Sequence, residues 1–269
     1  MHSLLVYASP GRDRSAVAAW IAEALGCGKK VLYKHAPTED AAAVLGRSLP
    51  EVGLDPAVLS SGRVELVDTT VLRAASGGQH QRLYELHVEQ ARQATREGFT
   101  GLALTGDAAA MRSVTRDATE LVGYERALGR LADQLAVPSL CRYPAHEQPE
   151  LLGDMLEVHF RDVDDEDWAA VVVADQLRVR GEIDFSNADR FAAVLRAVIA
   201  DGLHRVDLSG LEFCAVAGIR ALLSATDRPH RGAAPLTLQG VAPLLLRLLT
   251  VTGAADRPGL QVIQRETDA

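Results

Sequence analysis

The sequence is poor in lysine, aromatic residues and cysteine, and each shortage excludes a class of protein. Only three of its 269 residues are lysine, and 36 Asp and Glu outnumber 28 Lys and Arg, which gives a formal net charge of -8. That balance excludes a nucleic-acid clamp or a polybasic membrane binder, because both attract phosphates with positive charge. Aromatic residues make up 4%, so the core has to be built mainly from Ala, Leu and Val.

Cysteines and long apolar runs are also scarce. Cys27, Cys141 and Cys214 are too few and too scattered for a disulfide framework or a CxxC-type zinc site. The chain does not start with a basic segment and a long apolar stretch, so we expect no secretory signal. No apolar run approaches the ~20 residues that span a membrane. We expect a cytoplasmic, folded protein, since 48% of its residues are hydrophobic and 24% are charged.

The first 160 residues alternate short apolar segments with longer amphipathic ones. The apolar segments predict strands at residues 3–8, 30–35, 63–68, 100–105 and 138–143. The segments between them predict helices at 14–25, 38–48, 80–97 and 119–135. Nearly continuous apolar strands that alternate with helices are typical of βαβ units. We therefore expect an α/β fold, with a mostly parallel sheet and helices on both faces.

The last 100 residues have a different strand pattern. Apolar and polar residues alternate at 177–180, 205–208, 236–239 and 260–262, which predicts strands that bury one face only. Helices are predicted at 188–199, after Gly218 and from Pro243, where proline suits a first helical turn. We expect a second sheet with helices on one face.

The two halves meet in an acidic stretch. Residues 161–168 hold five acidic side chains and one arginine. We interpret them as a linker between an N-terminal domain at 1–160 and a C-terminal domain at 169–269, because the strand pattern changes there. The alternative is a solvated turn within one domain.

Several segments of the second half resemble, in the same order, the STAS domain of anti-sigma factor antagonists. The run Val206–Phe213 followed by Gly218–Leu222 carries the resemblance, together with Arg180–Asp184 and Leu238–Val241. The resemblance covers roughly residues 168–265. It implies a STAS-type sheet with helices on one face, and a partner that is an anti-sigma factor, a GHKL-type kinase or another STAS-binding protein.

The resemblance breaks at the usual phosphorylation site. STAS domains usually carry Asp-Ser-Ser/Thr-Gly at the start of the central helix, and the first serine is phosphorylated. Here that stretch is Ala215, Val216, Ala217 and Gly218, and valine has no hydroxyl to modify. Two interpretations of this stretch, with Arg220 beside it, stay open. One is a partner-docking surface fixed in its unphosphorylated-like state, and the other is a degenerate domain kept for packing or dimerisation.

The first half resembles MEDS domains, which are sensory domains named for methanogens, methylotrophs and a dichloromethane regulator. The matching pieces are His2, Gly28–Tyr33, Gly98–Leu102, Thr105–Asp107, Tyr124–Glu125, Leu140–Tyr143 and His159. The sequence departs from the family at Asp107, where glutamate is usual, and at Phe160, where proline is usual. The resemblance implies a RecA-like sheet that binds a small molecule.

A RecA-like ancestry raises the question of nucleotide binding. Residues 8–15 follow the first strand, where a phosphate loop would lie. Ala8 and Asp13 replace both framing glycines of GxxxxGK[ST], and Arg14 replaces its lysine. Without the glycines the backbone cannot approach a phosphate closely, and Asp13 repels it. We expect neither nucleotide binding nor ATP hydrolysis.

Polar residues at the expected carboxyl ends of the strands are candidates for a ligand pocket, because ligands of parallel sheets bind there. With the Tyr-Glu motif, the candidates are His35, Asp68, Asp107, Tyr124, Glu125, Cys141 and Tyr143. The alternative is that strand ends are polar only because they meet water. Histidine and cysteine also bind transition metals, and the candidates for that role are Cys141, His159 and His2. Against it, His2 should lie at the amino edge of its strand and Cys141 near the carboxyl edge.

Together these features predict a signalling protein that is not an enzyme. The first domain would sense a small ligand, and the second would act like an anti-sigma factor antagonist under the control of the first. The main alternative is a non-catalytic interaction scaffold or homodimer. A RecA-like enzyme is a third, and no nucleophile-elbow motif supports it.

Overall fold

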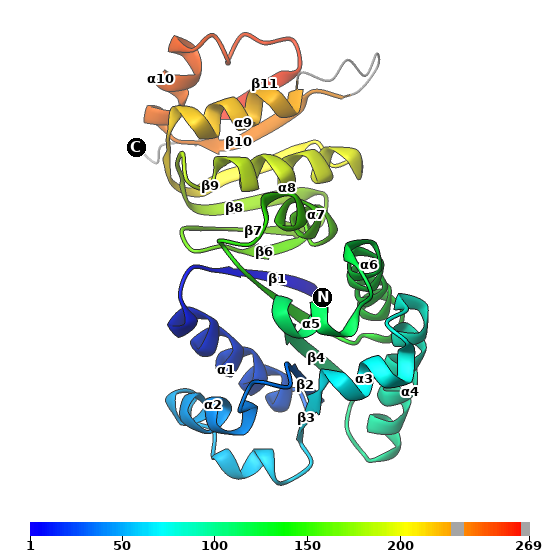
Figure 1. Ribbon diagram of the computed structural model, residues 1–269. Coiled ribbons are helices and arrows are strands. Elements are labelled where there is room, and N and C mark those ends of the chain that lie inside the picture. Colours follow the sequence, from blue (N-terminus) through cyan, green and yellow to red (C-terminus); the bar gives the residue numbers. More distant parts are fainter. Residues whose placement is uncertain (227–233, 265–269) are drawn as a thin grey trace. The chain divides into compact units, whose positions relative to one another are not determined.

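The structure is a computed structural model that describes residues 1–226 and 234–264. The chain forms two compact units, Met1–Leu151 and Leu152–Ala269, and each is described by itself (Figure 1). The end of the predicted second domain, 265–269, lies outside the described residues. No helix of the described part has the length and apolar composition that a membrane crossing requires.

The first unit is built on a parallel sheet, and its strands lie within two residues of the predicted ones. The strands are β1 (His2–Tyr7), β2 (Lys30–His35), β3 (Val64–Asp68), β4 (Leu102–Asp107) and β5 (Ser139–Pro144). Their order across the sheet is β1-β5-β4-β2-β3, and all neighbours are parallel. The chain therefore steps outward to β3 and then returns through β4 to β5.

This order places helices on both faces, because right-handed crossovers in opposite directions cover opposite faces (Figure 1). The helices are α1 (Pro10–Gly26), α2 (Ala41–Ser48), α3 (Thr69–Ser76), α4 (His80–Arg96), α5 (Ala108–Val114) and α6 (Ala118–Leu135), with short 3-10 turns η1 (Leu49–Val52) and η2 (Pro56–Leu59). A further helix, α7 (Pro149–Val158), contains the boundary between the two units, and most of its residues belong to the second. The predicted α/β class is confirmed. Three of these helices, α3, α5 and α7, were not predicted.

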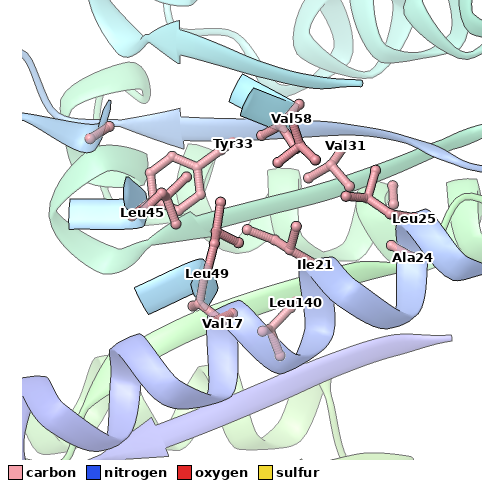
Figure 2. Close-up of a cluster of buried hydrophobic side chains, with 14 of the residues drawn as sticks. Val17, Ile21, Ala24, Leu25, Val31, Tyr33, Leu45, Leu49, Val58 and Leu140 are labelled. Carbon is pink, nitrogen blue, oxygen red and sulfur yellow. The ribbon is translucent and has the colours of Figure 1, made fainter. Parts of the chain in front are cut away.

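The core on the α1 face is aliphatic, as the shortage of aromatic residues requires. Ile21 and Leu25 of α1 pack with Val31 and Tyr33 of β2 and with Leu45 of α2, all nearly inaccessible to solvent (Figure 2). Removing this apolar surface from water stabilises the fold by roughly 25 cal/mol per Å².

The loop after β1, where a phosphate loop was considered, starts α1 instead. Ser9 caps the helix by accepting a hydrogen bond from the backbone N–H of Arg12 at 3.3 Å. Asp13, in the first turn, accepts hydrogen bonds from Arg142 of β5 at 2.7 and 3.0 Å, and Arg142 also donates to the hydroxyl of Tyr33 at 3.2 Å. Arg142 is 2% exposed, so Asp13 is the counter-ion of a buried arginine.

The second unit is a mixed sheet with the order β6-β7-β8-β9-β10-β11. Its strands are β6 (Asp162–Asp164), β7 (Trp168–Val173), β8 (Gln176–Ile183), β9 (Arg205–Cys214), β10 (Leu236–Val241) and β11 (Leu260–Gln264). The pairs β6–β7 and β7–β8 are antiparallel, and the other described pairs are parallel. Its helices are α8 (Ala188–Ala200), α9 (Val216–Thr226) and α10 (Pro243–Val251). Buried and accessible residues alternate along β8, which agrees with the predicted one-sided sheet.

The acidic stretch at 161–168 differs from the expected linker, because it contains β6 and the turn that leads into β7. Asp165 is 1% exposed and accepts hydrogen bonds from the indole N–H of Trp168 at 3.0 Å and from Arg190 of α8 at 2.5 Å. One acidic residue of this stretch is thus an internal anchor. Gly181, at φ +89°, lies against the turn, where a Cβ would be 2.2 Å from the carbonyl oxygen of Asp167, so only glycine fits.

Candidate functional site

His2, Cys141 and Tyr143 lie on the same face of the first sheet. In the parallel pair of β1 and β5, His2 is opposite Ser139 and Leu4 is opposite Cys141. Side chains two residues apart along a strand share a face. The alternation of β5 therefore sends Ser139, Cys141 and Tyr143 to the side on which His2 lies.

Glu125 comes to this face from α6. It occupies the buried stripe of that helix, next to Tyr124 and Leu128, and it is 0% exposed. The thiol of Cys141 donates to its Oε2 at 2.9 Å, and the hydroxyl of Tyr143 donates to its Oε1 at 2.9 Å. A carboxylate in an apolar stripe needs such partners to offset the loss of water.

His2 completes the cluster. Its Nε2 lies 3.5 Å from the Sγ of Cys141 and 3.5 Å from the Oε2 of Glu125. The expectation that His2 and Cys141 lie at opposite edges of the sheet is wrong. The strand β5 starts at Ser139, opposite His2, so Cys141 is only two residues from the amino edge.

The donor set of His2, Glu125 and Cys141 fits a transition-metal ion. The potential ligand atoms lie within 4.8 Å of one another, at the separations of 2.9 to 3.5 Å given above. Ligands of a tetrahedral zinc ion, at bond lengths of about 2.0–2.3 Å, are about 3.3–3.6 Å apart. Burial, followed by the charge of Glu125, raises the pKa of the Cys141 thiol. The thiol is therefore protonated, and a metal ion bound there would have to displace that proton.

His159 remains a predicted ligand. It belongs to the second compact unit and follows α7. Its Nδ1 donates to the backbone carbonyl oxygen of Met155 at 2.7 Å. With the proton on Nδ1, the lone pair is on Nε2, which is the tautomer that a histidine bound to metal through Nε2 adopts.

Two of the predicted residues at the carboxyl edge, Asp68 and Asp107, serve as helix caps. Asp68 accepts hydrogen bonds from the backbone N–H and the hydroxyl of Thr70, at 2.7 and 2.8 Å. Asp107 caps α5 by accepting from the backbone N–H of Ala110 at 2.6 Å. The Nδ1 of His35 lies 3.0 Å from the carbonyl oxygen of Ala36. Of the seven predicted ligand residues, the structure gathers Glu125, Cys141 and Tyr143, with Tyr124 beside them.

Tyr124 belongs to a second buried group, which sequence reasoning missed. Its hydroxyl lies 2.8 Å from the Nζ of Lys34 on β2 and 2.7 Å from the Nε2 of His87 on α4. The Nδ1 of His87 lies 2.6 Å from the Oε1 of Gln90. Lys34 and His87 are each at most 1% exposed. A lysine inside an apolar strand and a histidine on the apolar face of a helix were the available signals.

Gly106 makes room for Lys34. In the register of the sheet, Lys34 pairs with Gly106, and Gly106 pairs with Cys141. A Cβ at Gly106 would lie 3.2 Å from the Cε of Lys34 and 3.2 Å from the Sδ of Met111. The side chain of Lys34 thus lies over the glycine, between its own strand and that of Cys141.

The second unit presents a different kind of site, an exposed apolar edge. We use "apolar edge" for Phe185, Phe213, Val216 and Leu244, which are 86%, 47%, 47% and 66% exposed. Phe213 is the second-last residue of β9, and the others lie two or three residues after the ends of β8, β9 and β10. Because these strands are parallel, their carboxyl ends meet at the same edge of the sheet.

The predicted partner-binding residues lie at this edge. Ala215 precedes α9, and Val216 starts it. Gly218 is buried against β8 and β9, since a Cβ there would be 2.7 Å from both the Sγ of Cys214 and the Cγ2 of Ile183. Ala217 is partly buried, and Arg220 is exposed.

A small groove of about 60 Å³ adjoins the apolar edge, and Phe213 and Leu244 belong to both. The other residues that line it are Leu208, Leu211, Glu212, Cys214, Ala242, Leu245 and Leu248. The aromatic residues of the edge were missed because exposure cannot be read from residue type alone.

Comparisons with known proteins agree with this division. The family model of the MEDS domain, described as methanogen/methylotroph, DcmR sensory domain, matches residues 1–160. The model described as Mlab, STAS domain matches residues 169–263. A sensory domain joined to a STAS domain defines a protein of signalling or regulation. The chain belongs to the MEDS family and carries a C-terminal STAS domain.

The other comparisons add little. A search of curated proteins found no match. Among the solved structures that match is an anti-sigma factor antagonist from Mycobacterium paratuberculosis, 23% identical, over 35% of this chain and 84% of that chain, with a TM-score of 0.31. At that TM-score the likeness supports no conclusion about this chain.

Proposed function

We propose that the chain is a non-enzymatic signalling protein, in which the first unit senses a small ligand and the second binds a partner protein in the manner of an anti-sigma factor antagonist. The ligand that the donor set fits best is a divalent transition-metal ion held by His2, Glu125 and Cys141. The observation that carries the sensing role is the burial of a histidine, a carboxylate and a thiol within 2.9 to 3.5 Å of one another.

Stability alone does not account for such a cluster. Buried polar groups stabilise a fold less than well-packed apolar side chains of the same volume. The cost is offset when a metal ion binds, because the ion replaces the thiol proton and satisfies all three side chains. When bound, the ion would supply a fixed positive charge to which His2, Glu125 and Cys141 are ligands. The hydrogen bond from Tyr143 orients Glu125 toward it.

The apolar edge supports the partner-binding role. Four large apolar side chains at one sheet edge are costly to expose to water, and such patches mark interaction sites. Val216 has no hydroxyl, so a kinase cannot add charge at this position. Control therefore comes from the first unit, where ligand binding shifts the population between a partner-competent and a partner-incompetent state.

Metal analysis of the full chain tests the sensing role. The purified protein is equilibrated with Co²⁺, and the thiolate-to-cobalt charge-transfer band and the bound metal are measured. We expect one ion per chain in the wild type, and a loss of about 100-fold or more in affinity for Cys141→Ser. Cys214→Ser, which removes a buried cysteine of the second unit, is the matched control and should keep full binding. Equal loss in both variants, or no binding by the wild type, contradicts the sensing role.

Affinity capture of the tagged full chain, repeated with and without Co²⁺, tests the partner role. Recovery of a GHKL-type kinase by the wild type, reduced in Phe213→Ser, supports it. Self-association alone favours the alternative, a dimerisation scaffold, for which the same exposed edge is the supporting observation. A kinase recovered equally by both proteins places its binding elsewhere.

A further inference from the structure

Lys34, Tyr124, His87 and Gln90 form a row of hydrogen bonds in which the donor and the acceptor of each bond can be assigned. Burial, followed by the charge of Lys34, lowers the pKa of His87 to about 3, so this histidine is neutral. Its Nδ1 faces the side-chain amide oxygen, Oε1, of Gln90. Because that oxygen can only accept a hydrogen bond, Nδ1 carries the ring proton. The other nitrogen, Nε2, is then an acceptor.

The direction of the other hydrogen bonds follows from this tautomer. Tyr124 donates its hydroxyl proton to the Nε2 of His87, at 2.7 Å. The oxygen of that hydroxyl keeps its lone pairs and accepts a hydrogen bond from Lys34, at 2.8 Å. His87 therefore fixes the hydroxyl of Tyr124 as an acceptor, which is the form that holds an ammonium group.

The ammonium group of Lys34 has an alternative partner, the carboxylate of Glu125. The side chain of Lys34 lies over Gly106 toward Cys141. Burial lowers the pKa of Lys34, and the charge of Glu125 opposes that shift. A buried ammonium group that loses its partner pairs with the nearest available anion. The carboxylate whose charge acts on Lys34 is that of Glu125.

We infer that Tyr124 and His87 are positioning residues that hold the ammonium group of Lys34 away from the metal-binding carboxylate of Glu125. The inference rests on the proposed metal site. Lys34 balances the charge of Glu125 from a distance, and its hydrogen bond to Tyr124 keeps the ammonium group from competing with the metal ion for Oε2, the carboxylate oxygen that faces Cys141 and His2. Released from that hydrogen bond, Lys34 pairs with Glu125 and competes with the ion.

A double-mutant cycle on the full chain, titrated with Co²⁺ through the charge-transfer band, tests this inference. Tyr124→Phe removes only the hydroxyl and should weaken Co²⁺ binding about tenfold. Lys34→Met removes the competing charge and should strengthen binding about tenfold. The decisive variant is the double mutant Tyr124→Phe/Lys34→Met, which should bind like Lys34→Met, because without the ammonium group the hydroxyl of Tyr124 has nothing to hold.

The controls separate this role from a general effect on folding. Tyr84→Phe removes a hydroxyl of the same unit that bonds Gln134 at the surface, and it should leave the affinity unchanged. His87→Leu should act in the same direction as Tyr124→Phe, and circular dichroism checks the fold of each variant. A double mutant as weak as Tyr124→Phe overturns the inference and leaves the metal site standing. A wild type that binds no Co²⁺ overturns both.

Discussion

The two units of this chain differ in which side chains they keep in an unfavourable environment. The first unit hides polar groups, since Lys34, His87, Glu125 and Arg142 are all at most 2% exposed. The second unit exposes apolar groups, with Phe185 at 86% as the extreme case. Each arrangement costs stability in the isolated protein. A buried polar cluster suits an ion or small molecule that enters the interior, and an exposed apolar edge suits a protein that covers it.

The largest effect should come from breaking a buried ion pair of the first unit. Asp13→Ala leaves Arg142 buried without its counter-ion, and we expect a loss of about 3–5 kcal/mol in the free energy of unfolding. The exposed pair of Asp175 and Arg205 in the second unit is the matched control, and Asp175→Ala should cost less than about 0.5 kcal/mol. Urea unfolding followed by circular dichroism measures both. Similar losses would show that burial does not distinguish the two pairs.

The second unit offers a matched pair of phenylalanines. Phe191 of α8 is 0% exposed and packs edge-on against Trp168, with ring centroids 5.5 Å apart. Phe191→Ala should cost about 3–5 kcal/mol of unfolding free energy. Phe185→Ala should change it by less than about 0.5 kcal/mol. If Phe185→Ala proves as destabilising as Phe191→Ala, then Phe185 is part of the core and not of a binding surface.

The fold could be predicted because its signals are local and repeated. Apolar strands such as Lys30–His35 stand between long amphipathic helices, and the structure has them at those residues. Elements that depend on distant partners could not be predicted. The turn at Asp165 looks solvated in an acidic stretch, yet Arg190, 25 residues further on, binds its carboxylate in the interior.

The candidate site could be predicted only in its members and not in its geometry. Cys141 and Tyr143 were chosen because they lie near an expected strand end, and Glu125 because it belongs to the Tyr-Glu motif; His2 was placed at the wrong distance from Cys141. The start of β5 was predicted to within one residue, but its register against β1 was not. That register sets Ser139 opposite His2, so Cys141 lies only two residues, about 7 Å, further along the sheet. Lys34 was missed because nothing local shows that Gly106 leaves space for it.

A smaller effect should come from a carboxylate held by partners far from it in the sequence. Glu120 accepts hydrogen bonds from the backbone N–H of His80, from Arg116 and from the His80 ring, which lowers its pKa from 4.5 to about 2. Its contribution to stability is fully present above pH 4.5 and is lost as the pH falls through about 2. Glu120→Gln should cost about 1 kcal/mol at pH 7. The difference from wild type should vanish near pH 2.

Asp184 is the contrasting carboxylate of the second unit. It accepts hydrogen bonds mainly from Ser186, two residues away, so its neutral variant should leave stability at pH 7 nearly unchanged. Acid unfolding curves of Asp184→Asn and Glu120→Gln give the comparison. A larger effect of Asp184→Asn would mean that local turns in the second unit contribute more than contacts between helices of the first.

The smallest effect should be a gain in stability at the apolar edge. Ala215 precedes α9, and its carbonyl oxygen accepts the backbone N–H of Ile219 at 3.2 Å, but its methyl group cannot accept a hydrogen bond from the first turn. Ala215→Asp adds such an acceptor and a negative charge at a helix N-terminus, so it should stabilise the unit by about 1 kcal/mol. The same change puts a charge on the apolar edge and should weaken partner binding. Ala215→Asn adds the cap without the charge and is the control. If Ala215→Asp weakens partner binding and Ala215→Asn does not, then the negative charge, and not the cap, is what the partner-binding surface does not tolerate.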